Sequence, residues 1–417
     1  MIRFVHTADI HFGIENYGRI DSKTGIHTRL SDFYNALSFC VDRAIAEDVD
    51  FFLFSGDAYK TAIPSPTQQR LLFDCFLRLF RAHIPLIILI GNHDNPLSFG
   101  KAHALELFNQ LPVSGFHVIS KPDSFVLETK SGPIQIIGIP WPSRINVALY
   151  GHNAHSTAQD VTQYISRGVS ALIDDFVKKL DPTVPAVLAG HLTVSSGLFS
   201  GSEKRAVLGN DPVFMPSQLA LKPLDYVALG HLHRYQNVSP DGSIPVVYAG
   251  SPERIDFGEQ AEEKGFCLVT IHDKNKTTHE FIKTPTRPFI LCETHLNEQE
   301  SQTEQIIKDL KNYTLEGAVL KIVYHVPAGK KDRVDVVAVQ QACIAAHYLV
   351  GIFPVRIPEP RERRINLKVT MSMDELLDHY LSSKPEWKDK RAQLIGRALE
   401  LKNELEQELE DKKPLET

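Results

Sequence analysis

Short apolar runs that end in Asp, Asn or His recur five times in this chain, and they constrain its fold more than any other feature. The runs are rich in β-branched and aromatic residues and read as buried strands. The polar residues that follow them are Asp9 and His11, Asp57, Asn92–Asp94, His191, and His231 and His233. Because ligands bind beyond the carboxyl ends of strands in open α/β sheets, we expect these side chains to converge on one site.

Amphipathic helical patterns separate the strands in the first two thirds of the chain. Apolar residues spaced three and four apart predict a helix after Ser31, which we expect to be its N-cap, and a second helix opening at Ser65 and Pro66. Continuous apolar strands alternating with helices indicate an α/β fold whose sheet is covered on both faces.

Three domains are predicted along the 417 residues. The run Thr284–Pro288 reads as a linker, so we expect one domain over 1–284 and a small α+β domain over 285–370. A helical tail follows over 371–417, with an apolar stripe that includes Leu394, Ala398, Leu401, Leu405 and Leu409. That stripe needs an apolar surface, either the chain's own core or the helices of a partner.

Composition excludes several classes of protein. The net charge of −6 does not by itself indicate a nucleic-acid partner. Five scattered cysteines without a CxxC pair argue against a disulfide framework or a zinc finger, and Cys40 and Cys75 fit buried thiols. Since no apolar run approaches the ~18 residues of a membrane span and the N-terminus does not resemble a signal peptide, we expect a cytoplasmic protein.

The polar residues beyond the strands have the composition of a metal centre. Any one cluster alone could be a polar turn or a hydrogen-bonded histidine, but the five in this order predict a site. Carboxylate oxygens together with imidazole nitrogens suit Mn²⁺, Fe²⁺ or Zn²⁺ better than Ca²⁺. The groups are too many for one ion and suit two ions that share a carboxylate, an arrangement that serves in-line hydrolysis of phosphate esters.

The clusters resemble the five motifs of the calcineurin-like metallophosphoesterases. The matching residues are Asp9-Ile10-His11, Gly56-Asp57, Gly91-Asn92-His93-Asp94, Gly190-His191 and Gly230-His231-Leu232-His233. The runs Tyr248–Arg254 and Glu262–Gly265 further resemble the segment that follows these motifs in the SbcD nucleases, bacterial relatives of the meiotic-recombination-eleven DNA repair nuclease. The resemblance covers about residues 1–270, and the later segments match only in order and size.

This resemblance implies a four-layer αββα sandwich with a small α+β capping domain and a C-terminal helical tail. It also implies two divalent ions, for which we expect Mn²⁺. One ion would bind Asp9, His11, Asp57 and His233, and the other would bind Asp57, Asn92, His191 and His231, with Asp57 bridging.

The resemblance assigns catalytic roles beside the metals. His93 would orient the scissile phosphate and protonate the leaving oxygen, and Asp94 would either hold that imidazole or cap a turn. Lys60 stands where many members of the nuclease branch carry a second histidine, and it can contact a phosphate as a point charge. Arg29 is a weaker candidate for phosphate contact, and Trp141 could either stack on a base or pack beside a turn.

The implied activity is a DNA nuclease of double-strand break repair, acting as a 3′→5′ exonuclease on duplex ends and an endonuclease on single strands. The tail would bind an SbcC-type coiled-coil ATPase, and the chain would form a homodimer through its first two helices, without membrane contact. Two alternatives remain open: a phosphatase or nucleotide phosphodiesterase with the same metals, and a non-catalytic scaffold.

Overall fold

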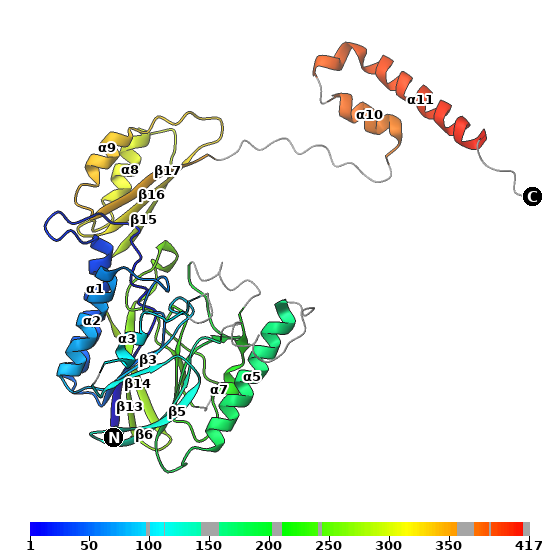
Figure 1. Cartoon of the computed structure of the whole chain (residues 1–417). Coiled ribbons are helices and arrows are strands. Elements are labelled where there is room, and N and C mark those ends of the chain that lie inside the picture. The colour runs from blue at the N-terminus through cyan, green and yellow to red at the C-terminus, as the bar shows by residue number, and fades with distance from the viewer. Residues whose placement is uncertain are drawn as a thin grey trace, which may run out of the picture. The chain divides into compact units, whose positions relative to one another are not determined.

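The computed structural model describes residues 1–96, 101–111, 113–142, 158–201, 211–240, 244–356, 371–382 and 385–411. The chain divides into two compact units (Figure 1). The first unit comprises Met1–Thr294, Glu300–Val323 and Val334–Phe353. The second comprises His295–Gln299, Tyr324–Arg333 and Pro354–Thr417.

The first sheet has six strands in the order β14-β13-β1-β2-β3-β4. Four of them are parallel to one another: β1 (Ile2–Thr7), β2 (Phe51–Phe54), β3 (Leu86–Leu89) and β4 (Phe116–Ile119). The first three are apolar runs that precede the predicted polar clusters, and β4 pairs with β3. The antiparallel strands β13 (Gly265–Asp273) and β14 (Lys276–Lys283) complete the sheet beside β1. Helices α1 (Thr28–Ala46) and α2 (Pro66–Arg81) contact each other and bury their apolar faces in the core that covers this sheet.

The second sheet also has six strands, in the order β11-β12-β10-β7-β6-β5. Its parallel centre consists of β6 (Gly132–Ile139), β7 (Ala186–His191), β10 (Tyr226–Gly230) and β12 (Val246–Tyr248). The antiparallel edges are β5 (Asp123–Thr129) and β11 (Gln236–Asn237). Helices α5 (Ala158–Lys178) and α7 (Pro216–Leu219) contribute apolar residues to the core on this sheet.

The two sheets pack face to face around a shared apolar core. Phe4 of β1 stacks on Phe51 of β2 at 4.4 Å between ring centroids, and it meets Tyr226 of the second sheet edge-on at 5.8 Å. Strands of both sheets contribute fully buried aliphatic side chains to this layer. The resulting order of helix, sheet, sheet and helix confirms the predicted four-layer fold.

Local signals account for where the first helices begin. Ser65 caps α2 with its hydroxyl, Gln68 returns the hydrogen bond, and Pro66 occupies the first turn, as predicted. The prediction of Ser31 as the first N-cap is wrong, because α1 begins four residues earlier than predicted and the His27 side chain accepts the hydrogen bond from the Arg29 amide. An imidazole nitrogen can therefore take the place of the usual hydroxyl or carboxylate at a cap.

A smaller sheet follows the predicted linker. It has three strands in the order β15-β16-β17. These strands are β15 (Phe289–His295), β16 (Val319–Val326) and β17 (Tyr348–Arg356), and they alternate with α8 (Gln302–Leu310) and α9 (Val336–Ala342). The segment is α+β as predicted, and residues 357–370 of the predicted domain lie outside the described residues.

The C-terminal segment is helical, as predicted. It consists of α10 (Met373–Ser382), a 3₁₀ helix over Pro385–Lys390 and α11 (Arg391–Asp411). Helix α10 contacts α11, while Leu394, Leu401 and Leu405 of the predicted stripe are exposed. Within the described residues, none of the helices has the length and apolar character required to cross a membrane.

The remaining described elements are short. They are α3 (Glu106–Asn109), the paired strands β8 (Thr193–Val194) and β9 (Val213–Phe214), and a 3₁₀ turn over Phe257–Glu259. The five cysteines are all free and buried, which confirms the reading of Cys40 and Cys75 as buried thiols.

Candidate metal centre

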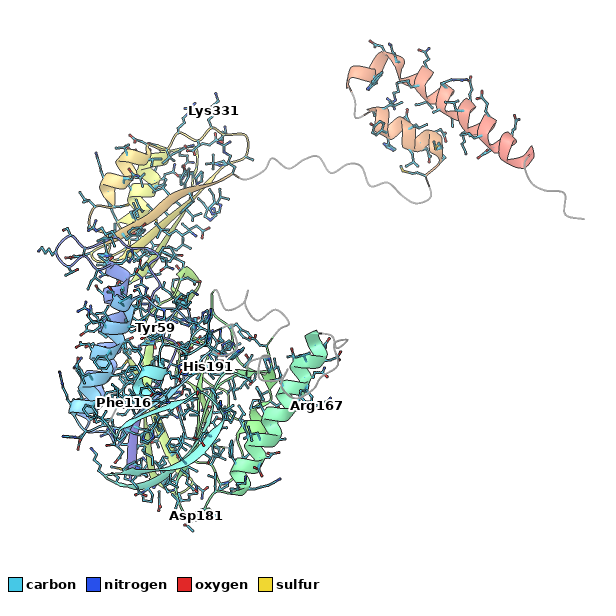
Figure 2. The ribbon with its side chains drawn as sticks, viewed as in Figure 1. Tyr59, Phe116, Arg167, Asp181, His191 and Lys331 are labelled. Atoms are coloured by element: carbon cyan, nitrogen blue, oxygen red, sulfur yellow. The ribbon has the colours of Figure 1, made fainter. Side chains whose placement is uncertain are left out.

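The polar residues predicted to form a site lie together at the carboxyl ends of strands from both sheets. The main-chain amide of His231, which follows β10, donates to the Asp9 carboxylate after β1 at 3.0 Å. His191, the last residue of β7 and labelled in Figure 2, donates from Nδ1 to the Ser55 carbonyl after β2 at 2.8 Å. The two sheets are therefore joined directly at the site.

The backbone of the site is strained. Four of its non-glycine residues have left-handed backbone angles: Asp9 (φ 56°), His11 (φ 49°), Asp57 (φ 58°) and His231 (φ 98°). Such conformations cost about 1–3 kcal/mol each and cluster at functional sites. Gly91 shows how tightly the loops approach, because a Cβ atom there would collide with the carboxylate of Asp57.

One group of donors gathers around His11. Ligand atoms of Asp9, His11 and His233 all lie within 4.8 Å of one another, and the three residues are buried. The Nε2 atoms of His11 and His233 are 3.0 Å apart. His11 Nε2 is also 3.6 Å from Asp57 Oδ2, so Asp57 borders this group.

A second group lies on the other side of Asp57. His191 Nε2 is 3.5 Å from Asp57 Oδ2 and 3.0 Å from Asn92 Oδ1. His231 Nδ1 lies 3.1 Å from the same Asn92 oxygen. Ligand atoms of Asp9, Asp57 and His191 also fall within 4.8 Å of one another, so the two groups of donors adjoin.

The hydrogen bonds of the imidazoles fit a cation between them. His191 donates from Nδ1 to a carbonyl, and His233 Nδ1 lies 2.9 Å from the Glu259 carboxylate, which can only accept. In a neutral ring this leaves Nε2 as an unprotonated lone pair directed at the other donors. The His233 Nε2 atom faces His11 Nε2 at 3.0 Å beside the Asp9 and Asp57 carboxylates, and this gathering of imidazole nitrogens and carboxylate oxygens suits divalent metal ions.

The buried Asp57 carboxylate carries a negative charge that would stabilise an added cation. Burial would raise the pKa of Asp57, but the adjacent His191, which is also hydrogen-bonded to it, holds that pKa well below its usual range. Burial would lower the pKa of His191, but the Asp57 charge and hydrogen bond raise it to about 9. Burial dominates at His11, whose pKa is well below its ordinary value despite the charge of Asp57.

His93 lies beside the donors and is less buried than the histidines and aspartates among them. Its Nδ1 donates to the Lys60 carbonyl at 2.9 Å, and its main-chain amide donates to Asp57 Oδ1 at 2.9 Å. Its ring meets that of His11 edge-on at 4.8 Å. The Lys60 side chain is exposed beside it, so the predicted phosphate-contact residue borders the site.

Asp94 does not hold His93, which corrects one of the two readings left open by the sequence. Its buried carboxylate accepts hydrogen bonds from the amides of Ala58, Tyr59 and Gly91 at 3.0–3.1 Å. Burial and the nearby Asp57 charge raise the pKa of Asp94 to about 7, while these amides lower it. Asp94 therefore braces the loop after β2 against the loop after β3.

Arg29 is placed away from solvent, which argues against the predicted contact with a phosphate. Its side chain is fully buried between the rings of Phe33 and Phe289. The guanidinium donates to Asp32 and to the Arg254 carbonyl. A buried cation with these partners serves packing of the fold rather than substrate contact.

Trp141 lies against the metal-ligand histidines predicted from the sequence. Its ring centroid is 4.9 Å from that of His231 and 6.0 Å from that of His191. Its main-chain amide donates to the Ile90 carbonyl. Trp141 therefore packs against these two histidines and forms one side of the site.

Three polar residues of the site were not identified from the sequence. Glu259 contacts His233, Lys264 contacts Glu259, and Asp211 Oδ2 lies 3.3 Å from His231 Nε2. Lys264 belongs to the run Glu262–Gly265, which contributed to the resemblance to the SbcD nucleases but was assigned no function from the sequence. Glu259 and Asp211 have no signal in the sequence, because their contacts depend on how loops return to the site.

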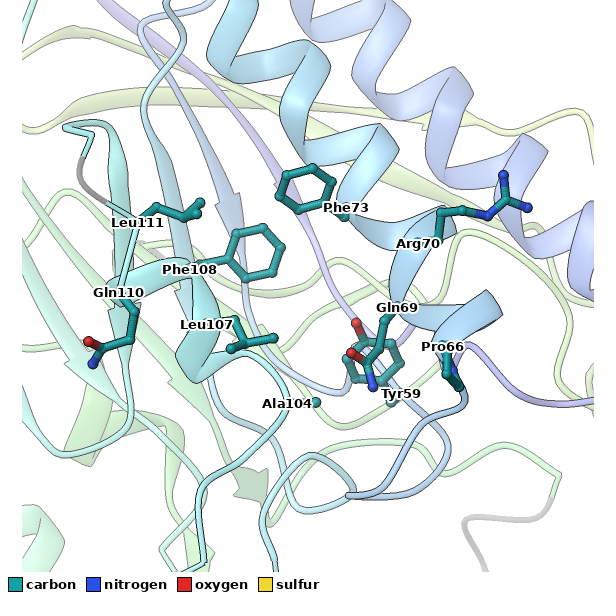
Figure 3. A pocket seen from close by; sticks show the side chains of 10 residues that line it. All are labelled: Tyr59, Pro66, Gln69, Arg70, Phe73, Ala104, Leu107, Phe108, Gln110 and Leu111. Carbon is teal, nitrogen blue, oxygen red and sulfur yellow. The ribbon is translucent and has the colours of Figure 1, made fainter.

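A separate apolar pocket of about 520 Å³ is lined in part by Tyr59, whose main-chain amide donates to Asp94 (Figure 3). Phe73 of α2 and Leu107 of α3 line it and are partly exposed. The complete lining is Tyr59, Pro66, Gln69, Arg70, Phe73, Ala104, Leu107, Phe108, Gln110 and Leu111.

Comparison with known proteins places this site in a family. The model of the calcineurin-like phosphoesterases matches residues 2–235. A solved dimetal phosphatase from Danio rerio is 10% identical, with 67% of this chain and 98% of its own chain covered and a TM-score of 0.39. The protein TT1561 of Thermus thermophilus is 14% identical, with the same coverage of 67% and 98% and a TM-score of 0.36. Because the family model spans more than half of the sequence, the chain belongs to the calcineurin-like phosphoesterases, metal-dependent hydrolases of ester bonds.

Proposed function

We propose that this chain is a two-metal DNA nuclease, a 3′→5′ exonuclease on duplex ends and an endonuclease on single strands, that works with an SbcC-type ATPase in double-strand break repair. The observation that carries the proposal is the place of the SbcD-like runs in the structure. Glu259, between them, contacts His233, and Arg254 in the first run donates to Thr286 Oγ1 and the Arg287 carbonyl in the linker. The segment that distinguishes the nuclease branch thus joins the metal centre to the added α+β segment.

We propose that the donor set divides between two ions as the resemblance implies. Asp9, His11, Asp57 and His233 would hold one ion, and Asp57, Asn92, His191 and His231 would hold the other. When bound, two divalent ions supply Lewis acidity to a phosphoryl oxygen and lower the pKa of an attacking water. Mn²⁺ is the metal we propose, since mixed carboxylate and imidazole ligands suit it.

His93 is the proposed acid. The hydrogen bond from its Nδ1 to the Lys60 carbonyl fixes the ring and leaves Nε2 for proton transfer to the leaving oxygen. Lys60 is the proposed phosphate contact, because its charge is exposed next to His93 while its carbonyl holds the ring. One residue would therefore both position the acid and attract the substrate.

Cleavage assays test the nuclease proposal directly. An end-labelled duplex, a single strand, a p-nitrophenyl phosphodiester and a phosphomonoester are each incubated with the full chain and Mn²⁺. We expect shortening of the duplex from its 3′ end and cutting of the single strand. Asp57→Ala should lose both activities, and Glu128→Ala, which removes an exposed carboxylate opposite Pro133 at the amino end of β6, should keep them.

The other outcomes separate the alternatives. Hydrolysis of the small esters alone would replace the nuclease with a phosphatase or nucleotide phosphodiesterase. Inactivity on every substrate, with and without an SbcC-type ATPase, would favour a scaffold.

The homodimer is also a proposal. The resemblance places the contact on the first two helices, and the exposed Phe73 of α2, beside the apolar pocket, supports a self-association surface there. Light scattering of the full chain should give a mass near twice 46.8 kDa. A monomer mass at all concentrations would remove the dimer from the proposal.

A further inference from the structure

His233 is held from behind by a carboxylate that is completely shielded from solvent. Glu259 Oε1 lies 2.9 Å from His233 Nδ1, and the side chain of Glu259 is 0% exposed. Its other oxygen accepts from the Ile255 amide at 2.8 Å and from Lys264 Nζ at 2.8 Å. Both carboxylate oxygens therefore have fixed donors, and Glu259 has little freedom to turn away from His233.

Lys264 holds the same histidine by a second route. Its side chain is also 0% exposed, and its ammonium contacts Glu259 Oε2 at 2.8 Å and Glu262 Oε2 at 3.1 Å. It donates in addition to the main-chain carbonyl of His233 at 3.0 Å. Thus the ring of His233 is fixed through Glu259 and its backbone through Lys264.

Stability alone is a weak explanation for this arrangement. Removing two opposite charges from water costs several kcal/mol per ion, and a well-packed apolar pair is often as stable. His191, in the second group of donors, has a neutral partner at Nδ1, the Ser55 carbonyl. A carboxylate partner does more than a carbonyl, because it raises the basicity of the opposite ring nitrogen as well as fixing the tautomer.

We propose that Glu259 is a positioning residue that keeps His233 protonated at Nδ1 and strengthens Nε2 as a donor to one of the two ions, with Lys264 locking Glu259 in place. The inference rests on the proposed two-metal function, which it deepens by assigning a role to the run Glu262–Gly265. It predicts that loss of the Glu259 charge lowers the affinity for one of the two ions and leaves the affinity for the other unchanged.

The tautomer is tested without any metal. Long-range ¹H–¹⁵N spectra of metal-free protein labelled at histidine, with the His233 signals assigned by a His233→Gln variant, should show the Nδ1–H form. In Glu259→Leu we expect a mixture of the two tautomers. An Nε2–H form of His233 in the unaltered chain would overturn the proposal.

The metal test uses matched variants. Glu259→Gln removes the charge facing His233, and Glu262→Gln removes a carboxylate that contacts Lys264, with no contact to His233 among those described. In titrations with Mn²⁺ alone, we expect Glu259→Gln to bind one of two ions about 10–100-fold more weakly and the other unchanged. Glu262→Gln should bind both ions as the unaltered chain does.

Thermal unfolding of the metal-free variants separates positioning from folding. If Glu259→Gln binds both ions equally more weakly and has a lower Tm, Glu259 has a structural role and the proposal is overturned. Unchanged affinity for both ions would overturn it as well. If Glu259→Gln does not fold, Glu259→Asp, which keeps the charge for Lys264 but shortens the reach to His233, replaces it. Two ions bound by an unaltered chain that cuts no DNA would reject the nuclease and leave this comparison valid.

Discussion

At the scale of single residues, the site is organised by the second nitrogen of each imidazole. His191 donates to a carbonyl, His233 to a carboxylate and His93 to the Lys60 carbonyl. Each of these bonds places a proton on Nδ1, so Nε2 of the same ring is left to bind a metal ion or to transfer a proton. His93 then differs from the candidate ligand histidines in position: it is less buried than they are and lies beside the donor groups.

His93→Ala tests that distinction. We expect hydrolysis of DNA to fall by at least ~100-fold, because general acid catalysis contributes about 10²–10⁴. Both ions should remain bound, as measured by Mn²⁺ titration. Loss of an ion in this variant would make His93 a ligand, a reading that its proximity to His11 and Asp57 also permits.

His6 makes the protein sensitive to acid at a position away from the donor groups. Burial lowers its pKa to about 3, although a hydrogen bond with the Leu229 backbone raises it. The unfolded chain binds the proton below about pH 6.5 and the folded chain does not, so stability present above that pH is lost as pH falls towards 3.

The unfolding free energy should therefore drop by about 2 kcal/mol more in the unaltered chain than in His6→Leu between about pH 7.5 and about pH 5.0. Urea denaturation of both chains at the two pH values measures this difference. Equal pH dependence in the two chains would show that His6 takes up its proton at the same pH in the folded chain as in the unfolded chain.

At the scale of elements, the loops after the strands build the site and a buried ionic cluster fastens α1 to the linker. Asp32 of α1 accepts two hydrogen bonds from Arg287 at 2.7 and 2.9 Å and one from Arg29 at 3.1 Å. The paired geometry is strong because Nε and Nη2 of Arg287 each donate to a different oxygen of Asp32. The cluster explains why Arg29 is unavailable to a substrate.

Asp32→Ala should destabilise the chain by about 3–5 kcal/mol, because it removes the carboxylate that Arg29 and Arg287 share and leaves buried Arg29 with the more distant Glu253 carboxylate at 3.5 Å. Asp42→Ala is the matched control on the same helix: Asp42 is 59% exposed and Asp32 only 8%. An exposed ion pair contributes less than about 1 kcal/mol. Urea denaturation measures both, and equal effects would contradict the assigned role of Asp32.

At the scale of the whole molecule, the helical segment differs from the rest in how much apolar surface it leaves open. Leu401 is 45% and Leu405 60% exposed on α11, whereas the sheets of the phosphoesterase segment enclose continuous cores. Unpaired leucines at helical spacing suit a partner helix. This supports, as a proposal, binding of an SbcC-type ATPase through the tail.

Deletion of residues 371–417 tests the tail. We expect the shortened chain to bind Mn²⁺ and cut DNA at the original rate, and to lose binding to the ATPase in a pull-down. Leu405→Glu in the full chain should weaken the same binding, while Lys402→Glu, at an exposed position of the same helix, should preserve it. Unfolding of the shortened chain would instead assign the stripe to the chain's own core.

The sequence by itself determined the layers and identified the candidate donor residues. Apolar strands with polar ends are a local signal, and parallel strands bring those ends to one edge, so Asp57 and Asn92, which follow neighbouring strands of the first sheet, could be placed together without coordinates. Tertiary structure alone decided what Asp94, Arg29 and Glu259 do. Their roles depend on which backbone amides or side chains face them across long stretches of chain, as with Arg29 and Arg254. A charged residue has the same local pattern whether it contacts substrate, braces a loop or fixes a ligand, and only the packing of distant segments selects among these.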